Sequence, residues 1–275
     1  MYDDYQVTPT EVEPAMLARP TFYLRLSKPV TSRVLMVVLL VGFLIEIVYG
    51  VVAYDTWMTF NGTDIMVLVD LGAKVNILIA TGEYWRLFTA TLLHGGILHL
   101  LFNLYALFAL GPLLEAYVGP LRFLAIYMVA GLYGSLASYA FADSISVGAS
   151  GAIFGIVGAT TVYFFRYRDN FGAQARAVLQ NMVVIVVINL VFGLSAGNID
   201  NWGHMGGLAG GALAALGLLP RYRRPAAVFS GHHALEVEER RLAEIGWVFL
   251  CFALFAAGVY VVTQNYQPEL QQFLR

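Results

Sequence analysis

Seven long apolar stretches, separated by shorter polar segments, dominate the chain. A membrane-spanning helix needs about 20 largely apolar residues, and each stretch is close to that length. The pattern therefore predicts seven spans, with approximate boundaries at Val34–Ala53, Ile97–Ala116, Leu121–Phe141, Ser150–Phe165, Val178–Leu194, Trp202–Leu219 and Gly246–Val262. The fourth span has a short apolar core.

The composition agrees with a membrane protein. Hydrophobic residues make up 59% of the chain and charged residues 12%, with a mean hydropathy of +0.70, whereas a soluble domain has roughly 25% charged residues. We therefore expect an all-α integral membrane protein built as a polytopic helical bundle. The net charge of −2 argues against a nucleic-acid partner.

The distribution of basic residues predicts the orientation, because Lys and Arg concentrate on the cytoplasmic side. If the N-terminus is cytoplasmic, that side holds Arg19, Arg25, Lys28, Arg33, Arg122, Arg166, Arg168, Arg176, Arg221, Arg223, Arg224, Arg240 and Arg241. The other side holds only Lys74, Arg86 and Arg275. With seven spans, the C-terminus is then external.

These features suggest four parts of the chain. They are a cytoplasmic N-terminal tail (1–32), a six-span core (33–220), a cytoplasmic linker (221–245), and a seventh span with a short external tail (246–275). The segment Tyr54–Trp85 is too polar to span, but it has apolar patches, so we expect it to lie at the membrane interface.

Three polar residues share one depth in this topology. His99 lies near the outer start of the second span, Ser150 opens the fourth, and His204 lies near the outer start of the sixth. Ionisable residues within spans are costly and mark functional sites by default. The alternative for Ser150, within the stretch "VGASGAIFG", is a small residue that only packs.

These residue types suit acyl transfer. A serine hydroxyl needs a neighbouring base, usually histidine, to become a nucleophile. The attacked carbonyl then needs hydrogen-bond donors. His99 and Asn103 lie on one helix face at i,i+4 spacing, and the first N–H groups of the fourth span are unpaired. The alternatives are an interhelical hydrogen bond for Asn103 and a buried, backbone-satisfied imidazole for His99.

Glycine spacing indicates which helices touch. The fourth span has Gly151 and Gly155, and the sixth has the pairs Gly206/Gly210 and Gly207/Gly211. Glycines at this spacing let helix backbones approach closely in lipid.

In sequence order, these motifs resemble the rhomboid intramembrane serine proteases from about Trp85 to Gly211. The matching pieces are the Trp85-Arg86 pair, "HGGILHLLFN", "LGPLLEAYVGPLRFLAIYMVAG", "GASG" and "NIDNWGHMGGLAGG". The seventh span after a six-span rhomboid-like core is an arrangement known in part of the family.

The resemblance implies roles for individual residues. Ser150 would be the nucleophile and His204 the general base of a dyad without an acidic third member. His99 and Asn103 would stabilise the transition state, and Phe154 would pack on the dyad. Asp200, the nearest acid to His204, is expected in a loop, without a direct catalytic role. The residues expected to give structural support are Trp85, Arg86, Glu115, Arg122, Gly148, Gly151, Gly206 and Gly210.

We therefore predict an intramembrane serine endopeptidase that cleaves single-span membrane proteins near the outer membrane face. The expected location is a bacterial inner membrane, with an organellar or eukaryotic membrane as the alternative. The partners are the lipid bilayer and transmembrane substrates, and no cofactor is expected.

Three rival functions are weaker. His94, His99 and His204 could supply three zinc ligands, but the His-Glu-x-x-His motif is missing, so no metal is expected. A transporter would show paired broken helices in two similar halves. The main alternative is a catalytically silent rhomboid-like protein that binds membrane-protein clients, although such relatives typically lack the serine or the histidine.

Overall fold

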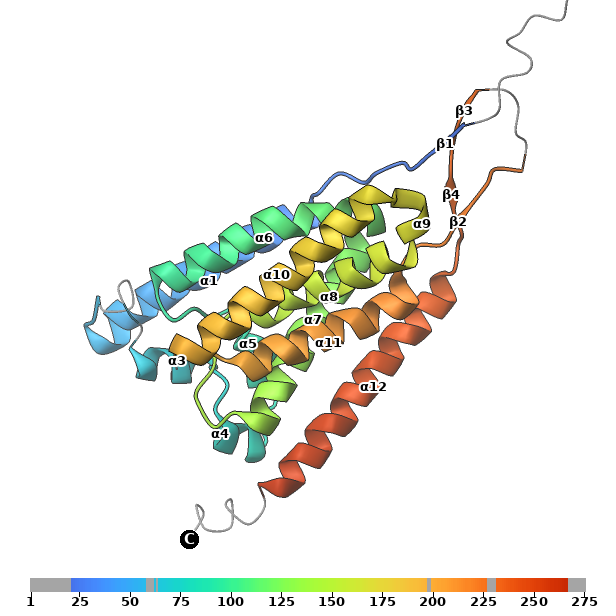
Figure 1. Ribbon diagram of the computed structural model, residues 1–275. Helices are drawn as coiled ribbons and strands as arrows, with labels where there is room; N and C mark the ends of the chain where they lie inside the picture. The colour runs from blue at the N-terminus through green and yellow to red at the C-terminus, as the bar shows by residue number, and fades with distance from the viewer. Residues whose placement is uncertain (1–20, 58–61, 63, 197–198, 227–230, 267–275) are drawn as a thin grey trace, which may run out of the picture. The chain divides into compact units, whose positions relative to one another are not determined.

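The computed structural model describes residues 21–57, 62, 64–196, 199–226 and 231–266. Most of the predicted tail 1–32 and the external tail beyond Tyr266 lie outside these residues. All seven predicted spans are helices, namely α1 (Thr31–Tyr54), α6 (Ile97–Val118), α7 (Pro120–Phe141), α8 (Ser150–Arg166), α10 (Ala173–Ala196), α11 (Asn201–Leu218) and α12 (Arg241–Asn265) (Figure 1). The predicted fold class, a polytopic helical bundle, is confirmed.

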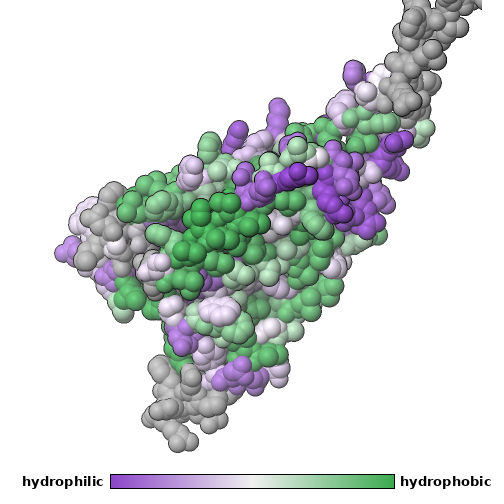
Figure 2. All heavy atoms as spheres, viewed as in Figure 1, coloured by the Kyte–Doolittle hydropathy of each residue, from purple (hydrophilic) through white to green (hydrophobic). Residues whose placement is uncertain are grey.

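Five of these helices, α1, α6, α7, α10 and α12, are long and apolar enough to cross a membrane. Figure 2 shows hydrophobic side chains gathered over α10, where Val187 and Phe192 are among the exposed residues. Helix α8 is shorter, with 17 residues, and α11 has 18 and is rich in glycine. That α8 and α11 also cross the membrane stays a prediction.

Three helices form the centre of the bundle, because α11 packs against both α7 and α8, which also contact each other. The glycines of α11 divide between these neighbours. Gly206 and Gly210 face α7, while Gly207 and Gly211 face α8, and a Cβ atom at any of the four would collide with the adjacent helix. Close approach of backbones therefore fixes the central packing.

Polar contacts attach two outer helices. The Glu115 carboxylate accepts the N–H groups of residues 30–32 at 2.7–3.0 Å, which satisfies unpaired donors at the start of α1. Arg122 of α7 pairs with Glu244 of α12 at 2.8 Å. This pairing stabilises the charged first turn of α12, which begins at Arg241, earlier than the predicted Gly246.

The predicted interfacial segment Tyr54–Trp85 contains two short helices, α3 (Ile65–Leu71) and α4 (Asn76–Ala80), and a third, α5 (Arg86–Thr89), follows it before α6. Helix α9 (Arg168–Phe171) connects α8 to α10.

A second compact unit contains residues 21–26 with the described part of 220–239. In it, β1 (Thr21–Tyr23) pairs in parallel with β3 (His232–Ala234), and β2 (Tyr222–Arg223) pairs antiparallel with β4 (Glu236–Val237). The sequence analysis expected only tail and linker here. The predicted division at residues 32, 220 and 245 remains a prediction.

Candidate active site

The structure brings Ser150 and His204 together although they are 54 residues apart. Ser150 is the first residue of α8, and His204 lies in the first turn of α11. The serine Oγ and the histidine Nε2 are 2.9 Å apart, which is hydrogen-bond distance. Gly151 next to the serine lies against the backbone of Gly203. The missing side chain of Gly151 thus lets the start of α8 approach α11.

An aromatic ring covers the imidazole. Phe154, one turn after Ser150, stacks on His204 with ring centroids 4.2 Å apart and an interplanar angle of 6°. This is the packing that the family resemblance implied. Because phenylalanine has no hydroxyl, its contribution is contact area, which limits the orientations open to the histidine ring.

No described carboxylate is hydrogen-bonded to the His204 ring. Asp200 is the nearest acid in sequence, but its side chain accepts the Gly203 N–H at 2.8 Å and the Ser146 hydroxyl at 2.7 Å. It therefore caps α11 and contacts the segment before α8. The arrangement is a serine–histidine pair rather than a triad.

Two side chains of α6 lie close to Gly148, two residues before Ser150. The Nδ1 atom of His99 accepts the Gly95 N–H at 3.1 Å, so in the neutral ring the proton resides on Nε2. Gly148 lies against His99, because a Cβ atom there would stand 2.8 Å from Nε2 and 3.9 Å from Asn103 Nδ2. Gly148 also has φ of 125°, so this position requires glycine on both grounds. Two donors thus face the segment that leads into Ser150.

Asn103 does not make the interhelical bond considered from sequence. Its Nδ2 donates within its own helix to the carbonyl oxygen of His99, at 2.9 Å. An amide nitrogen has two N–H groups, so a second donor remains available.

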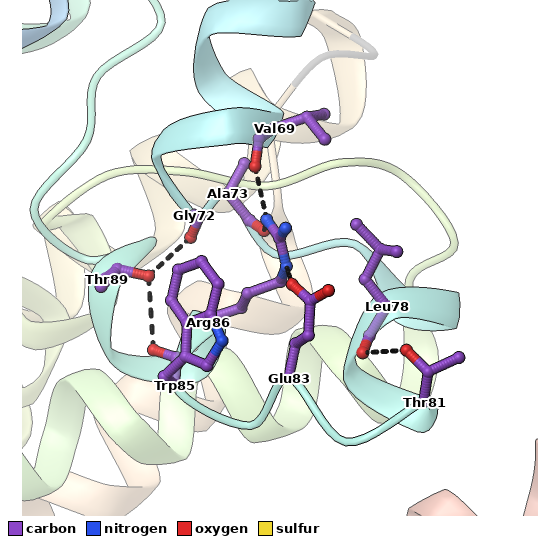
Figure 3. Close-up of polar contacts among 9 residues, drawn as sticks. All are labelled: Val69, Gly72, Ala73, Leu78, Thr81, Glu83, Trp85, Arg86 and Thr89. Carbon is purple, nitrogen blue, oxygen red and sulfur yellow. Dashed lines mark hydrogen bonds and ion pairs between the residues drawn. The ribbon is translucent and has the colours of Figure 1, made fainter.

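The predicted Trp85-Arg86 pair organises the loop between α1 and α6 (Figure 3). Arg86 is 5% exposed and donates to the carbonyl oxygens of Val69 and Ala73 at 2.6 and 3.2 Å. It also pairs with Glu83 at 2.7 Å, and its guanidinium lies 4.7 Å from the Trp85 ring centroid. These contacts satisfy loop carbonyls, which supports a structural role for both residues.

Glu46 and His94 form a connection that the sequence analysis did not foresee. Glu46, buried within α1, accepts the His94 N–H at 2.9 Å. The His94 ring lies 5.3 Å from that of His99. Burial lowers the pKa of His94 to about 3, and the adjacent His99 adds to this effect, so His94 is neutral. Across the described residues, no cluster of three or more His, Cys, Asp or Glu side chains could hold a metal ion.

A cavity of about 30 Å³ adjoins Ser150, with walls that include Gly131, Gly134, Lys74 and Asp200. This exceeds the roughly 10–15 Å³ that a cavity needs to hold a water molecule, and the walls offer polar partners. Lys74 was noted in the sequence only as one of three outer basic residues. Nothing near it in the chain predicts that it would meet residues from 138 to 200.

Comparisons with known proteins match the part of the chain that contains these residues. A family profile described as "Rhomboid domain" matches residues 81–221. The chain is 50% identical over 165 residues to "Rhomboid protease GluP" of Bacillus subtilis, a match that covers 58% of this chain and 32% of that protein.

Two further relatives are more distant. The chain is 34% identical over 163 residues to "Putative rhomboid protease YdcA" of Bacillus subtilis, covering 57% of this chain and 79% of that protein. It is 33% identical over 172 residues to "Rhomboid protease AarA" of Providencia stuartii, covering 54% and 61%. The chain thus matches about a third of the length of GluP, but most of YdcA.

Proposed function

Because the chain belongs to the rhomboid family, an assignment carried by the profile match and the named proteases, we propose that it is an intramembrane serine endopeptidase. The substrates are single-span membrane proteins. The observation that supports this most is the 2.9 Å contact between Ser150 Oγ and His204 Nε2, beside a polar cavity.

In the proposed mechanism, Ser150 Oγ attacks the carbonyl carbon of the scissile peptide bond while His204 Nε2 accepts the hydroxyl proton. The imidazolium then returns that proton to the amide nitrogen as the carbon–nitrogen bond breaks. An acyl-enzyme remains. Water, deprotonated by His204, attacks the ester, and the second product leaves as Ser150 regains its proton.

The oxyanion formed in each step needs donors. We assign this role to His99 Nε2, the free N–H of Asn103 and the backbone N–H of Ser150. The first two lie beside Gly148, and unpaired N–H groups at the start of α8 provide the third. Donors fixed before reaction stabilise developing charge without reorganisation.

The membrane setting constrains the substrate. The amide of a helical residue is shielded by its own turn, so the substrate helix must unwind locally before Ser150 can reach it. The inferred orientation places the N-terminus in the cytoplasm and the C-terminus outside, in a bacterial inner membrane, because thirteen of the 16 basic residues then lie inside. Cleavage would occur near the outer face.

The test uses the purified protein in liposomes with a single-span substrate. Wild type should release the substrate's outer part, whereas Ser150→Ala and His204→Ala should each abolish cleavage. The double variant should be no worse than either single one, since the two residues act as a unit. Matched controls are Ser195→Ala on α10 and His232→Ala on β3, both exposed, which should cleave like wild type.

The alternative, a silent client-binding protein, predicts the opposite result. Wild type would then retain the substrate uncleaved, and Ser150→Ala would bind it equally well. Zinc chelation provides a second arm. Cleavage should survive the chelator, whereas loss of cleavage with recovery on adding zinc would favour a metal site at His94, His99 and His204.

A further inference from the structure

The segment 142–149, named here the serine loop, connects the end of α7 to Ser150. The N-terminus of α8 has no side-chain cap of its own. The position of Ser150 therefore depends on what holds this loop.

Lys74 holds one end of the serine loop. The residue is 1% exposed, and its Nζ donates to the carbonyl oxygens of Ser138, Ala142 and Ser144 at 3.3, 2.6 and 2.8 Å. An ammonium group has three N–H donors, so all of them are used. The last carbonyls of a helix carry partial negative charge, so Lys74 both stabilises the end of α7 and fastens the loop.

The main chain of Lys74 adds a second attachment. Its N–H donates to the carbonyl oxygen of Ser146 at 3.0 Å, and the Ser146 N–H donates back at 3.2 Å. This isolated antiparallel bridge fixes the middle of the serine loop to the segment between α3 and α4.

Asp200 then connects the loop to the helix that bears the histidine. One carboxylate oxygen accepts the Ser146 hydroxyl at 2.7 Å, and the other accepts the Gly203 N–H at 2.8 Å. The carbonyl oxygen of Asp200 accepts the N–H of His204 at 3.1 Å. Ser146 precedes Ser150 by four residues, as Asp200 precedes His204. One hydrogen bond therefore joins the two segments that carry the reacting side chains.

Charge supports this arrangement. Burial lowers the pKa of Lys74 to about 8, while Asp200 and Asp143 favour its charged form. The amine is therefore protonated at neutral pH, and Lys74 and Asp200 line the same cavity.

We propose that Lys74, Ser146 and Asp200 form a positioning network that sets the distance between Ser150 and His204. The inference rests on the proposed function and adds residues that act through the dyad without touching the substrate. A displacement of about 1 Å in a reacting group can cost about 100-fold in rate, so a network of this kind matters for catalysis beyond its effect on stability.

The sharpest test is Ser146→Ala, which deletes one hydroxyl and leaves the α11 cap and the Lys74 contacts in place. We expect kcat to fall about 10- to 100-fold with little change in KM, and phosphonate labelling of Ser150 to slow by a similar factor. Ser144→Ala is the matched control, because Ser144 is exposed in the same loop and only its carbonyl joins the network. It should behave like wild type.

Four further variants separate positioning from general stability. Ser146→Thr keeps the hydroxyl and should restore most of the rate. Asp200→Ala should slow cleavage, and combining it with Ser146→Ala should cost less than the product of the two single effects, because both remove the same hydrogen bond. Lys74→Met should have the largest effect on the rate, but it also removes the contact at the end of α7. If Lys74→Met fails to fold, the Ser146 variants decide whether the network positions the dyad.

The outcomes are distinguishable. Normal labelling and kcat in folded Ser146→Ala would overturn the network while leaving the proposed protease intact. A loss of activity explained entirely by a smaller folded fraction would also overturn it. Wild type that neither cleaves nor labels at Ser150 would overturn the proposed function and this inference together.

Discussion

Helices α10 and α11 follow each other in the chain, yet they are packed in opposite ways. Helix α11 presents glycines to α7 and α8 at backbone contact distance. Its His204 is buried, with 7% of the residue exposed. In α10, only Ala175, Met182 and Gly193 are buried among the described side chains. Lipid is as apolar as a helix surface, so the hydrophobic effect does not drive helices together in a membrane. Close packing there depends on small residues that let helix backbones approach. The site thus lies on the helices with glycine faces, and α10 presents its valines and isoleucines outward.

The first prediction concerns the glycine face itself. In Gly211→Leu, the new side chain would run into the backbone of Gly155, which cannot move aside without separating α11 from α8. Overpacking a core typically costs about 1–3 kcal/mol and occasionally more, and contact with backbone on the facing helix places this change at the upper end. We expect little folded protein and no cleavage, measured by size-exclusion profile and turnover.

Gly246→Leu is its control, because nothing lies within 4 Å of a Cβ atom at that helical glycine. It should fold and cleave normally. A well-folded, active Gly211→Leu would contradict the glycine-based account of the central packing.

Asn103→Ala should have the next largest effect, on rate rather than fold. Loss of one oxyanion donor costs about 10²–10³ in kcat, roughly 2.7–4 kcal/mol, and the loss is smaller if His99 and the backbone compensate. The matched control is Asn189→Ala in α10, which also donates to the carbonyl four residues before it, at 2.8 Å. It should leave the rate unchanged. A lower melting temperature with normal turnover per folded molecule would remove Asn103 from the site.

Phe154→Ala should reduce the rate more modestly. Aromatic stacking contributes about 0.5–1.5 kcal/mol beyond buried area, so the less constrained His204 ring should slow turnover by roughly 2- to 10-fold. Phe154→Tyr keeps the stacked ring and should retain most of the activity. An equal loss of turnover in both variants would show that stacking on His204 does not account for the effect.

Phe192→Ala, the counterpart of Phe154→Ala on α10, should have the smallest effect on stability and turnover. Phe192 is 63% exposed, so its truncation removes little packing, and surface changes of this kind usually stay within about 0.5 kcal/mol. Melting temperature and turnover should match wild type. A rate change of more than about threefold in either direction would show that this face of α10 takes part in the reaction.

The sequence was most informative where its signals were local. Apolar length predicted seven helices, and spacing of Gly206 and Gly210 predicted close packing, because both patterns repeat within one helix. The shared depth of Ser150 and His204 followed from the topology, and the structure places them in contact. Their catalytic roles remain predictions.

Contacts between distant segments that neither periodicity nor topology specifies could not be predicted. Lys74, Ser146 and Asp200 stand far apart in the chain, and each alone resembles an ordinary loop residue. The strand pairing of Thr21–Tyr23 with His232–Ala234 also joins segments more than 200 residues apart. The pairing of Glu244, in the first turn of α12, with Arg122 of α7 is likewise a contact that only the folded chain reveals.

The most direct test of the central claim is to map where a serine-reactive phosphonate attaches to the purified protein. The account predicts one adduct, on Ser150, formed quickly in wild type and lost or strongly slowed in His204→Ala, with Ser195 on α10 unlabelled in both. An adduct confined to another serine, or labelling of Ser150 that does not depend on His204, would contradict the proposed dyad.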